Sequence, residues 1–482
     1  MLSAITNKIK ANKYIYIIAL LGFLLRVFFY FFGAAMYYGK KSFYIGGDTD
    51  SFLVPIKNLI DFGTLSVDIN NPKGAFGREP GYSFLLAPFY ILFGNNTDLL
   101  CKAVCWFQII LDSLCIVLFY KVALTVFKNN KIAIVSAVLY AIYPFVIVWT
   151  SVVQAESIGV DVLILMMYYL SKQNISYRYF IVGGLVAIGF FIRPQLLFLL
   201  PAIGFSLIVF YKKNIKKWMK YGIHLAIGFL IVYSPWPIRN YVFHNQLELF
   251  RDISTMRPWQ DDVQNFHEYI VSMQVDWEPQ FTQIITSNDS VSFPQAAYTS
   301  KADSLKLIKA IALSRTCGDG FASFMRKPPI QENNCTKETG QLWKSLYENQ
   351  VKYNPLNVFL WVPLKNLQKG IFKISLVKNW KSPALPAKTV FLVGILFSYR
   401  TFLILLGLIG CVFYFKQKNN ALNIVMLCTL FYFIIWYFWM CFIYRALEMR
   451  YFLPADVLLL FPAAFVLHTF LNRFSLFKKY LA

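Results

Sequence analysis

The sequence predicts an all-α polytopic membrane protein of about ten transmembrane helices, with a further domain of mixed secondary structure outside the membrane. Three observations support this prediction. Hydrophobic residues make up 57% of the chain and charged residues only 15%. The mean hydropathy is +0.51, which excludes an ordinary soluble domain. The apolar residues also gather in runs of about 20, the length that a helix needs to cross a bilayer.

The spans follow from these runs in chain order, because a helix satisfies its own backbone hydrogen bonds in lipid. We expect spans at about 14–36, 99–127, 132–150, 156–171, 177–193, 194–211, 221–237, 389–415, 421–443 and 450–471. Two other stretches are expected at the membrane interface, since 81–94 is short for a span and 355–380 mixes Trp361 with several lysines. The first run is longer than the core of a signal peptide and lacks a clear cleavage site, so it is predicted to be a signal anchor.

The distribution of charge predicts the orientation. The hydrophilic segments rich in Lys and Arg lie at 1–13, 128–131, 171–178, 211–220, 416–420 and 472–482, and none of the 24 acidic residues lies in them. By the positive-inside rule these segments face the cytoplasm, which places both termini inside. Topology thus explains most of the formal net charge of +23. No nucleic-acid partner is expected, because the chain lacks a soluble basic surface interleaved with aromatic residues.

The remaining hydrophilic segments, at about 37–98 and 238–388, are expected outside. We therefore divide the chain into an N-terminal transmembrane module (1–240, with its first outer loop at 37–98), an extracytoplasmic domain (241–388) and C-terminal transmembrane helices (389–482). The middle domain is long enough for a core of its own, and its weak periodicity favours short helices with a few strands. Only two of the eight cysteines, Cys317 and Cys335, lie in it. They either pair, adding about 3 kcal/mol in an oxidising compartment, or stay free thiols.

Candidate chemistry begins in the first outer loop. Asp48 and Asp50 follow two glycines that ease a turn of the backbone. A carboxylate at this place can act as a general base or bind a cation. Arg78 lies near the end of the same loop, and an arginine suits a phosphate because its planar guanidinium donates two hydrogen bonds at once. A solvated acidic loop and an interfacial anchor are the simpler alternatives, and both stay open at this point.

Further charged residues recur at the outer ends of later spans. They are Glu156, Arg193, Arg239 and Arg450. Each of them alone would suit an anchor, because a charge at the end of a span costs less than a charge near the bilayer centre. Together with Arg78 they make five sites on the face that holds Asp48, and this coincidence favours a functional site there.

Other charged and metal-binding residue types are expected to be structural. Six charged residues lie deeper, within or near spans, and are expected mostly to pair between helices: Arg26, Lys102, Asp112, Asp161, Arg400 and Asp456. The four histidines lack the spacing of metal ligands, so a zinc site is not expected. Neither a Walker-type loop nor a dinucleotide fingerprint occurs in the sequence.

Several short sequence blocks follow one another along the chain, and their order is informative. The first is Asp48-x-x-x-Phe52, followed by Gly63, Arg78-x-Pro80-Gly81-Tyr82 and Phe93-Gly94; then come Tyr143-Pro144 with Glu156-Ser157, Ile192-Arg193-Pro194, Pro235-Trp236-x-Ile238-Arg239-Asn240 and Arg450-Tyr451-x-x-Pro454. This order resembles the GT-C glycosyltransferases, most closely the bacterial protein mannosyltransferase-like branch that includes the lipid A aminoarabinose transferases. The resemblance covers residues 14–240 well, the last three spans loosely and 241–388 little. Phe52 replaces the usual tyrosine, and Glu79 departs from many members.

The resemblance implies an enzyme that takes a sugar from a polyprenyl-phosphate carrier and transfers it, with inversion, to an acceptor outside the membrane. Asp48 would be the general base, with Asp50 supporting it and Glu156 as a further candidate. The positive charges expected to meet the leaving lipid phosphate are Arg78, Arg193, Arg239 and Arg450. Asp48 and Asp50 are also the residues that would hold a divalent cation, if the reaction uses one.

The expected location follows from the charge pattern together with this resemblance, whereas the sequence leaves the acceptor open. The enzyme would be a multi-pass protein of the cell (inner) membrane, with its active site facing the periplasm or exterior. A surface glycan such as lipopolysaccharide, a lipid or a protein could each be the acceptor. Two alternatives are a flippase or transporter of lipid-linked sugars, and a polymerase or ligase of lipid-linked oligosaccharides. The concentration of polar residues on one side favours an enzyme over a transporter, which would line a cavity at the midplane.

Overall fold

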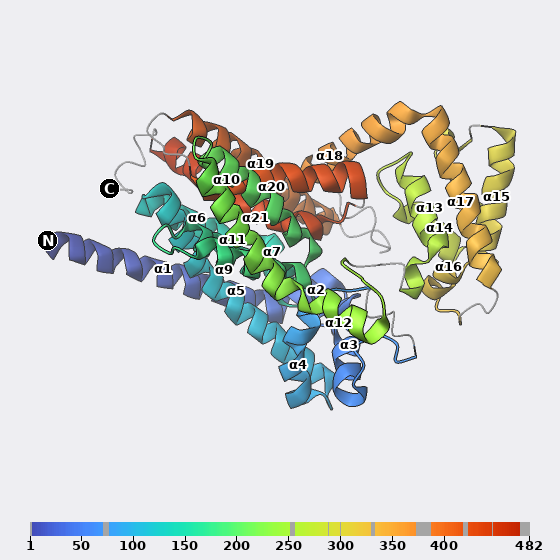
Figure 1. Cartoon of the computed structure of the whole chain (residues 1–482), viewed down its shortest axis with the longest axis horizontal. Helices are drawn as coiled ribbons and strands as arrows, with labels where there is room; N and C mark the ends of the chain where they lie inside the picture. The colour runs from blue at the N-terminus through green and yellow to red at the C-terminus, as the bar shows by residue number, and fades with distance from the viewer. Residues whose placement is uncertain are drawn as a thin grey trace.

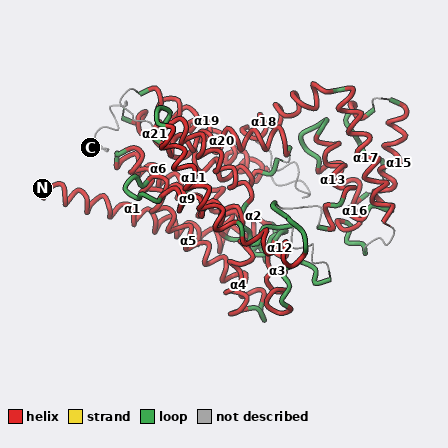
Figure 2. The backbone as a smooth tube through the Cα atoms, in the orientation of Figure 1, coloured by secondary structure: helices red, strands yellow, loops and turns green. Residues whose placement is uncertain are grey.

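The computed structural model describes residues 2–70, 77–250, 256–287, 289–298, 300–328, 333–372, 387–417, 423–445 and 447–472. Within these ranges every regular element is a helix, as the tube in Figure 2 shows. The predicted all-α fold is therefore confirmed.

One group of helices forms a bundle that occupies the left and the centre of Figure 1. Its members are α1 (Leu2–Phe28), η1 (Phe29–Gly33), α2 (Ala34–Tyr38), α5 (Thr97–Phe127), α6 (Asn130–Ala141), α7 (Pro144–Thr150), α8 (Glu156–Ser171), α9 (Arg178–Ile192), η3 (Pro194–Phe198), α10 (Leu199–Phe210), α11 (Ile215–Tyr233), α12 (Pro235–His244), α19 (Ala387–Lys416), α20 (Ile424–Phe438), η9 (Trp439–Tyr444) and α21 (Met449–Leu471). Each predicted span falls on one or more of these helices. In Figure 1, α1 begins and α21 ends at the same end of the bundle.

The helices of the bundle differ in length. Among the described residues, six helices are long and apolar enough to cross a membrane, and α6 with α7 makes a seventh if this pair, bent by 50°, is counted as one span. The other three predicted spans fall on shorter helices, of 16 residues in α8, 15 in α9 and 12 in α10. A helix of 16 residues is about 24 Å long, less than the bilayer core of about 30 Å. These helices pack against α5, α11 and α20, so much of their surface is covered by protein.

Two helical elements, each of two helices, lie at or beside the stretches that the sequence predicts at the membrane interface. The helices of the first outer loop are α3 (Thr49–Phe62) and α4 (Gly81–Phe93), and α4 packs on α3 and α5. Further along the chain, η7 (Asn357–Trp361) and α18 (Val362–Phe372) leave Phe359 and Trp361 exposed. Residues 373–380 of that predicted stretch lie outside the described residues. The interfacial position of both elements stays a prediction.

The second group of helices lies apart from the bundle, on the right of Figure 1, and α18 leads from it to the bundle. It consists of η5 (Arg257–Trp259), α13 (Asp261–Val271), α14 (Glu278–Thr286), η6 (Gln295–Ala297), α15 (Lys301–Thr316), α16 (Asp319–Phe324) and α17 (Asn333–Tyr353). The expected mixture with strands is wrong, since none of the described residues here forms a strand. Val263, Phe266 and Ile270 on α13 do follow helical spacing and are fully buried. In helices this short the pattern is too brief to stand out in the sequence.

This outer helical domain has its own core and a covalent link. Trp343 is fully buried, contacts Phe266 and Tyr269 and donates a hydrogen bond from its indole nitrogen to Ser314. Cys317 and Cys335 form a disulfide, with 5.5 Å between their Cα atoms. The bond joins the end of α15 to the first turn of α17. The pairing is thus the alternative that the structure favours over two free thiols.

The deep charges largely pair between helices, as expected. Arg26 pairs with Asp112 and Arg400 pairs with Asp456, and these side chains are at most 2% exposed. Lys102 instead pairs with Asp98 in an exposed position. Asp161 is buried and forms no ion pair among the described residues. The two buried pairs therefore belong to the packing of the bundle.

Candidate active site

The loop that carries Asp48 is fixed to a second loop of the bundle. Asp48 directly precedes α3, and the next residue, Thr49, is 1% exposed. The Thr49 hydroxyl accepts a hydrogen bond from the Gly46 amide (2.8 Å) and donates one to the Val153 carbonyl (2.9 Å). The Val153 amide in turn donates to the Tyr44 carbonyl. These bonds hold Asp48 beside the turn between α7 and α8.

Gly46 serves this contact in a way that the sequence does not reveal. Its φ is not in the left-handed region, so no turn requires a glycine here. A Cβ atom at Gly46 would instead lie 2.2 Å from the side-chain nitrogen of Gln154. The glycine therefore allows a close approach of the two loops.

A charge network joins five of the predicted residues. The Asp48 carboxylate binds Arg78 through one oxygen (2.8 Å) and Arg450 through the other (2.6 Å). Arg450 also lies 3.3 Å from Glu156, and Glu156 lies 3.1 Å from Arg193. These residues come from the position before α3, the stretch before α4, the first turns of α8 and α21, and the junction of α9 with η3. The structure thus brings together side chains that are up to 402 residues apart in sequence.

Packing behind the network keeps it in place. Tyr82 donates a hydrogen bond to Gln108, and Gln108 donates to the carbonyls of Thr150 and Val152 in the turn before Glu156. Gly159, one turn into α8, leaves room for Arg193, whose side chain would lie 2.8 Å from a Cβ atom there. The first turn of α8 and Arg193 are therefore held by uncharged neighbours as well as by charge.

The arginines control the acidity of Asp48. Burial of this carboxylate would by itself raise its pKa, but Arg78 and Arg450 outweigh burial and, with a smaller contribution from Arg193, lower the pKa to about 2. Asp48 is consequently ionised at neutral pH. As long as both arginines hold it, it is a weak base.

Two predicted residues lie outside this network. Asp50 is exposed on the first turn of α3 and forms no ion pair among the described residues. Arg239 lies on α12, donates to the neighbouring Asn240 side chain and stacks near Trp236 and Phe243. The structure therefore does not join these two side chains to Asp48.

A divalent cation at Asp48 or Asp50 stays a prediction. No group of three or more His, Cys, Asp or Glu side chains is placed to hold a metal ion in the described part of the chain. Both Asp48 oxygens contact arginines, so a cation at Asp48 would have to displace Arg78 or Arg450.

Sequence reasoning missed two members of the network. Gln154 lies 3.5 Å from Arg450, and Glu448 accepts a bond of 2.5 Å from the same guanidinium. Each stands two residues before a residue that was predicted, Glu156 or Arg450. A polar or charged residue two positions before a charged residue at the end of a span is the signal that could have identified Gln154 and Glu448.

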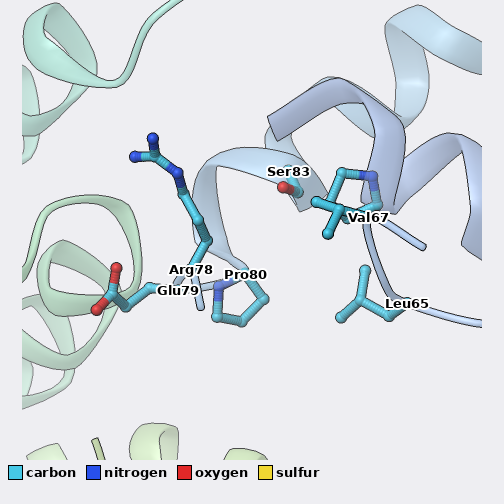
Figure 3. A pocket seen from close by; sticks show the side chains of 7 residues that line it. Leu65, Val67, Arg78, Glu79, Pro80 and Ser83 are labelled. Atoms are coloured by element: carbon cyan, nitrogen blue, oxygen red, sulfur yellow. The ribbon is translucent and has the colours of Figure 1, made fainter. Parts of the chain in front are cut away.

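A small pocket opens beside the network, between α3 and α4. Its lining residues are Pro55, Leu65, Val67, Arg78, Glu79, Pro80 and Ser83. Figure 3 shows the charged ends of Arg78 and Glu79 on one side of it and the apolar Leu65 and Val67 on the other. Through Arg78 the pocket shares a residue with the network.

The comparison with protein families agrees with the resemblance noted above. Residues 77–238 match the family model of dolichyl-phosphate-mannose-protein mannosyltransferases. The matched segment has 162 of the 482 residues, about a third of the chain. The matched segment contains Arg78, Glu156 and Arg193, whereas Asp48 and Arg450 lie outside it. A comparison with curated proteins gave no match.

Proposed function

With this family match as the premise, we propose that the protein transfers a sugar from a polyprenyl-phosphate donor to an acceptor outside the membrane, with inversion at the sugar C1. The observation that carries the proposal is the charge network. It combines the partly exposed Asp48 carboxylate with three arginines, the groups that a displacement of a phosphate by a hydroxyl needs.

Each member of the network has a role in this reaction. Asp48 accepts the proton of the acceptor hydroxyl. Arg78 and Arg450 bind the lipid phosphate and stabilise the charge that develops on it as the bond to C1 breaks. Arg193 adds positive charge nearby, and Glu156 orients Arg193 and Arg450, since it contacts both.

The proposed setting follows the charge pattern of the sequence. The network is assigned to the periplasmic or exterior face of a cell membrane, with both termini in the cytoplasm. A donor on that face has to be carried by a lipid, because nucleotide sugars are made in the cytoplasm. The acceptor is proposed to be a surface glycan, a lipid or a protein.

The variant Asp48→Asn tests the role of the base. Loss of a general base reduces a rate by about 10²- to 10⁴-fold, so we expect transfer to fall by that factor while insertion and abundance stay normal. Asp50→Asn is the matched comparison, because that carboxylate is exposed and outside the network. Near-normal transfer by Asp48→Asn would move the base to Asp50 or Glu156.

A labelled donor separates the proposed reaction from its alternatives. The protein is reconstituted in vesicles with a radiolabelled polyprenyl-phosphate sugar, and the lipid product is identified. Release of polyprenyl phosphate supports the transferase. A lipid-linked oligosaccharide that releases polyprenyl pyrophosphate would indicate a polymerase or ligase, and movement of the donor across the membrane without release would indicate a transporter.

A further inference from the structure

The two arginines nearest to Asp48 occupy both of its oxygens. Arg78 holds one oxygen at 2.8 Å and Arg450 holds the other at 2.6 Å. The same two guanidiniums are the groups proposed to bind the lipid phosphate. One pair of arginines thus has two anionic partners, the carboxylate of the base and the phosphate of the donor.

The geometry of inversion separates these partners. In a displacement with inversion, the acceptor oxygen attacks C1 from the side opposite to the departing phosphate. The base lies on the attacking side and the phosphate on the leaving side, with the sugar between them. Arginines that hold the phosphate cannot keep their close contacts with Asp48 during the reaction.

Arg78 and Arg450 have other contacts that keep them in the site when they leave Asp48. The Arg450 guanidinium also contacts Glu156 at 3.3 Å and Glu448 at 2.5 Å. Arg78 stacks over the ring of Phe52, with 4.6 Å between its guanidinium carbon and the ring centre. Their side chains are 18% exposed, so a phosphate can reach them.

We infer that the donor phosphate takes Arg78 and Arg450 from Asp48 and so frees this carboxylate to deprotonate the acceptor, which makes donor binding a precondition for activating the acceptor. The inference rests on the proposed function and adds an order of events to it. The charged groups that face Asp48 come from several elements: Arg78 before α4, Arg450 on α21, Arg193 between α9 and η3, and Glu156 on α8 through Arg450.

The step balances without a further reactant. The acceptor O–H proton passes to an Asp48 oxygen, and the acceptor oxygen forms a bond to C1. The bond from C1 to the phosphate oxygen breaks, and its electron pair stays on polyprenyl phosphate, which the arginines hold. When that lipid leaves, the arginines return to Asp48, where they lower its pKa to about 2, and the proton passes to water.

Chemical labelling of carboxyl groups tests the exchange without a known acceptor. Carbodiimides with an added amine modify protonated carboxyl groups, and the modified peptide is measured by mass spectrometry. The protein in lipid nanodiscs is labelled at pH 5 with polyprenyl phosphate, with polyprenol or with neither. Of these three conditions, we expect only polyprenyl phosphate to raise labelling of Asp48 relative to Asp50. The gain should be up to tenfold for each unit by which the pKa of Asp48 rises.

Variants test whether the release of the arginines from Asp48 causes the gain in labelling. Arg78→Gln should raise Asp48 labelling in the absence of lipid and reduce the further gain on adding polyprenyl phosphate. Arg257→Gln is the matched control, because Arg257 pairs with Asp319 in the outer helical domain. It should leave Asp48 labelling as in the unmodified protein.

The outcome separates this inference from the proposed function. Sugar transfer without any gain in Asp48 labelling, at the same polyprenyl-phosphate content, would overturn the exchange and leave the transferase standing. A gain in labelling without transfer from any polyprenyl-phosphate sugar would support the exchange as phosphate binding and count against the transferase. Equal gains with polyprenol and polyprenyl phosphate would also overturn the exchange, because polyprenol has no phosphate.

Discussion

Two kinds of arginine–carboxylate cluster occur in this molecule. In the membrane bundle, Arg400 binds Asp456 at 2.7 Å, and the Tyr437 hydroxyl donates to the same carboxylate at 2.6 Å. Arg26, Asp112 and Tyr140 form a second triad of the same composition. In the charge network, three arginines share the buried Glu156 and the partly exposed Asp48, with Glu448 at the edge.

The triads and the network differ in how each charge is paired and in how far it is exposed to solvent. In each triad one arginine meets one aspartate, and the guanidinium also donates to backbone carbonyls, such as that of Gly370. The Arg400 and Asp456 side chains are 1% and 2% exposed, whereas Asp48 is 25% exposed and Arg78 and Arg450 are each 18% exposed. In a closed pair of this kind each partner compensates the other's buried charge, so loss of one partner destabilises the fold, while accessible arginines that share carboxylates can exchange a partner for a ligand.

Among the arginines, the largest effect is expected for Arg450→Gln in the network. This change removes one of the charges that face the leaving phosphate, and we expect transfer to fall by about 10²- to 10³-fold. The thermal unfolding temperature in detergent should change little. Arg450→Lys should recover part of the activity, because it keeps the charge but not the fork of donors. If Arg450→Gln instead lowers the unfolding temperature and leaves transfer by the folded protein normal, Arg450 belongs with the structural pairs.

Arg400→Gln in the bundle should act in the opposite way. It leaves Asp456 buried without its cation, which costs about 3 to 5 kcal/mol of stability. We expect a lower unfolding temperature and lower abundance in the membrane, with normal transfer per folded molecule.

A double variant sharpens this contrast. Replacing both partners by apolar residues, as in Arg400→Met with Asp456→Leu, should restore much of the stability, since buried ion pairs can often be replaced at little cost. The corresponding Arg450→Met with Asp48→Leu should remain folded and inactive. Recovery of transfer in the second pair would show that the network, too, is only structural.

A smaller effect is expected from acid. The pKa of Asp48 is lowered from its ordinary 3.8 to about 2, so its contribution to stability is present above about pH 4 and is lost as the pH falls towards 2. The contribution is at most about 2 kcal/mol. Between pH 5 and pH 3 the unfolding temperature of Asp48→Asn should therefore fall less than that of the unmodified protein. The unfolding temperature of Asp50→Asn should fall as much as that of the unmodified protein. An equally small fall in both variants would contradict the pairing of Asp48.

Hydropathy predicted the bundle well because length and composition decide whether a helix can cross a bilayer. The run at 99–127, for example, is the helix Thr97–Phe127. The bend between α6 and α7 was not predicted, since Tyr143-Pro144 was read as part of one span at 132–150. A proline at the first position of α7 starts a new helix there. Several helices of the outer domain were missed because the helical pattern is too brief in them, as in α13 with 11 residues and α16 with 6.

The candidate site could be predicted as a set but not as a network. Charge at the outer ends of spans identified Asp48, Arg78, Glu156, Arg193 and Arg450, and the structure brings these five together. The same criterion also selected Arg239, which lies on α12 with Asn240 as its hydrogen-bond partner. Charge at the end of a span indicates only the side of the bundle on which a residue lies. Which ends meet depends on packing between helices far apart in sequence.

The smallest effect is expected for Lys309→Gln on the outer helical domain. Lys309 and Glu338 are 2.7 Å apart, the same distance as Arg400 and Asp456, but their side chains are 58% and 52% exposed. Water screens such a pair, so we expect the free energy of unfolding to change by less than about 0.5 kcal/mol, measured by denaturant unfolding. Because the distance is equal, the ratio of this change to that of Arg400→Gln isolates the effect of burial. Equal losses in the two variants would mean that distance alone sets the strength of these pairs, and the distinction between the triads and the network would then lack its physical basis.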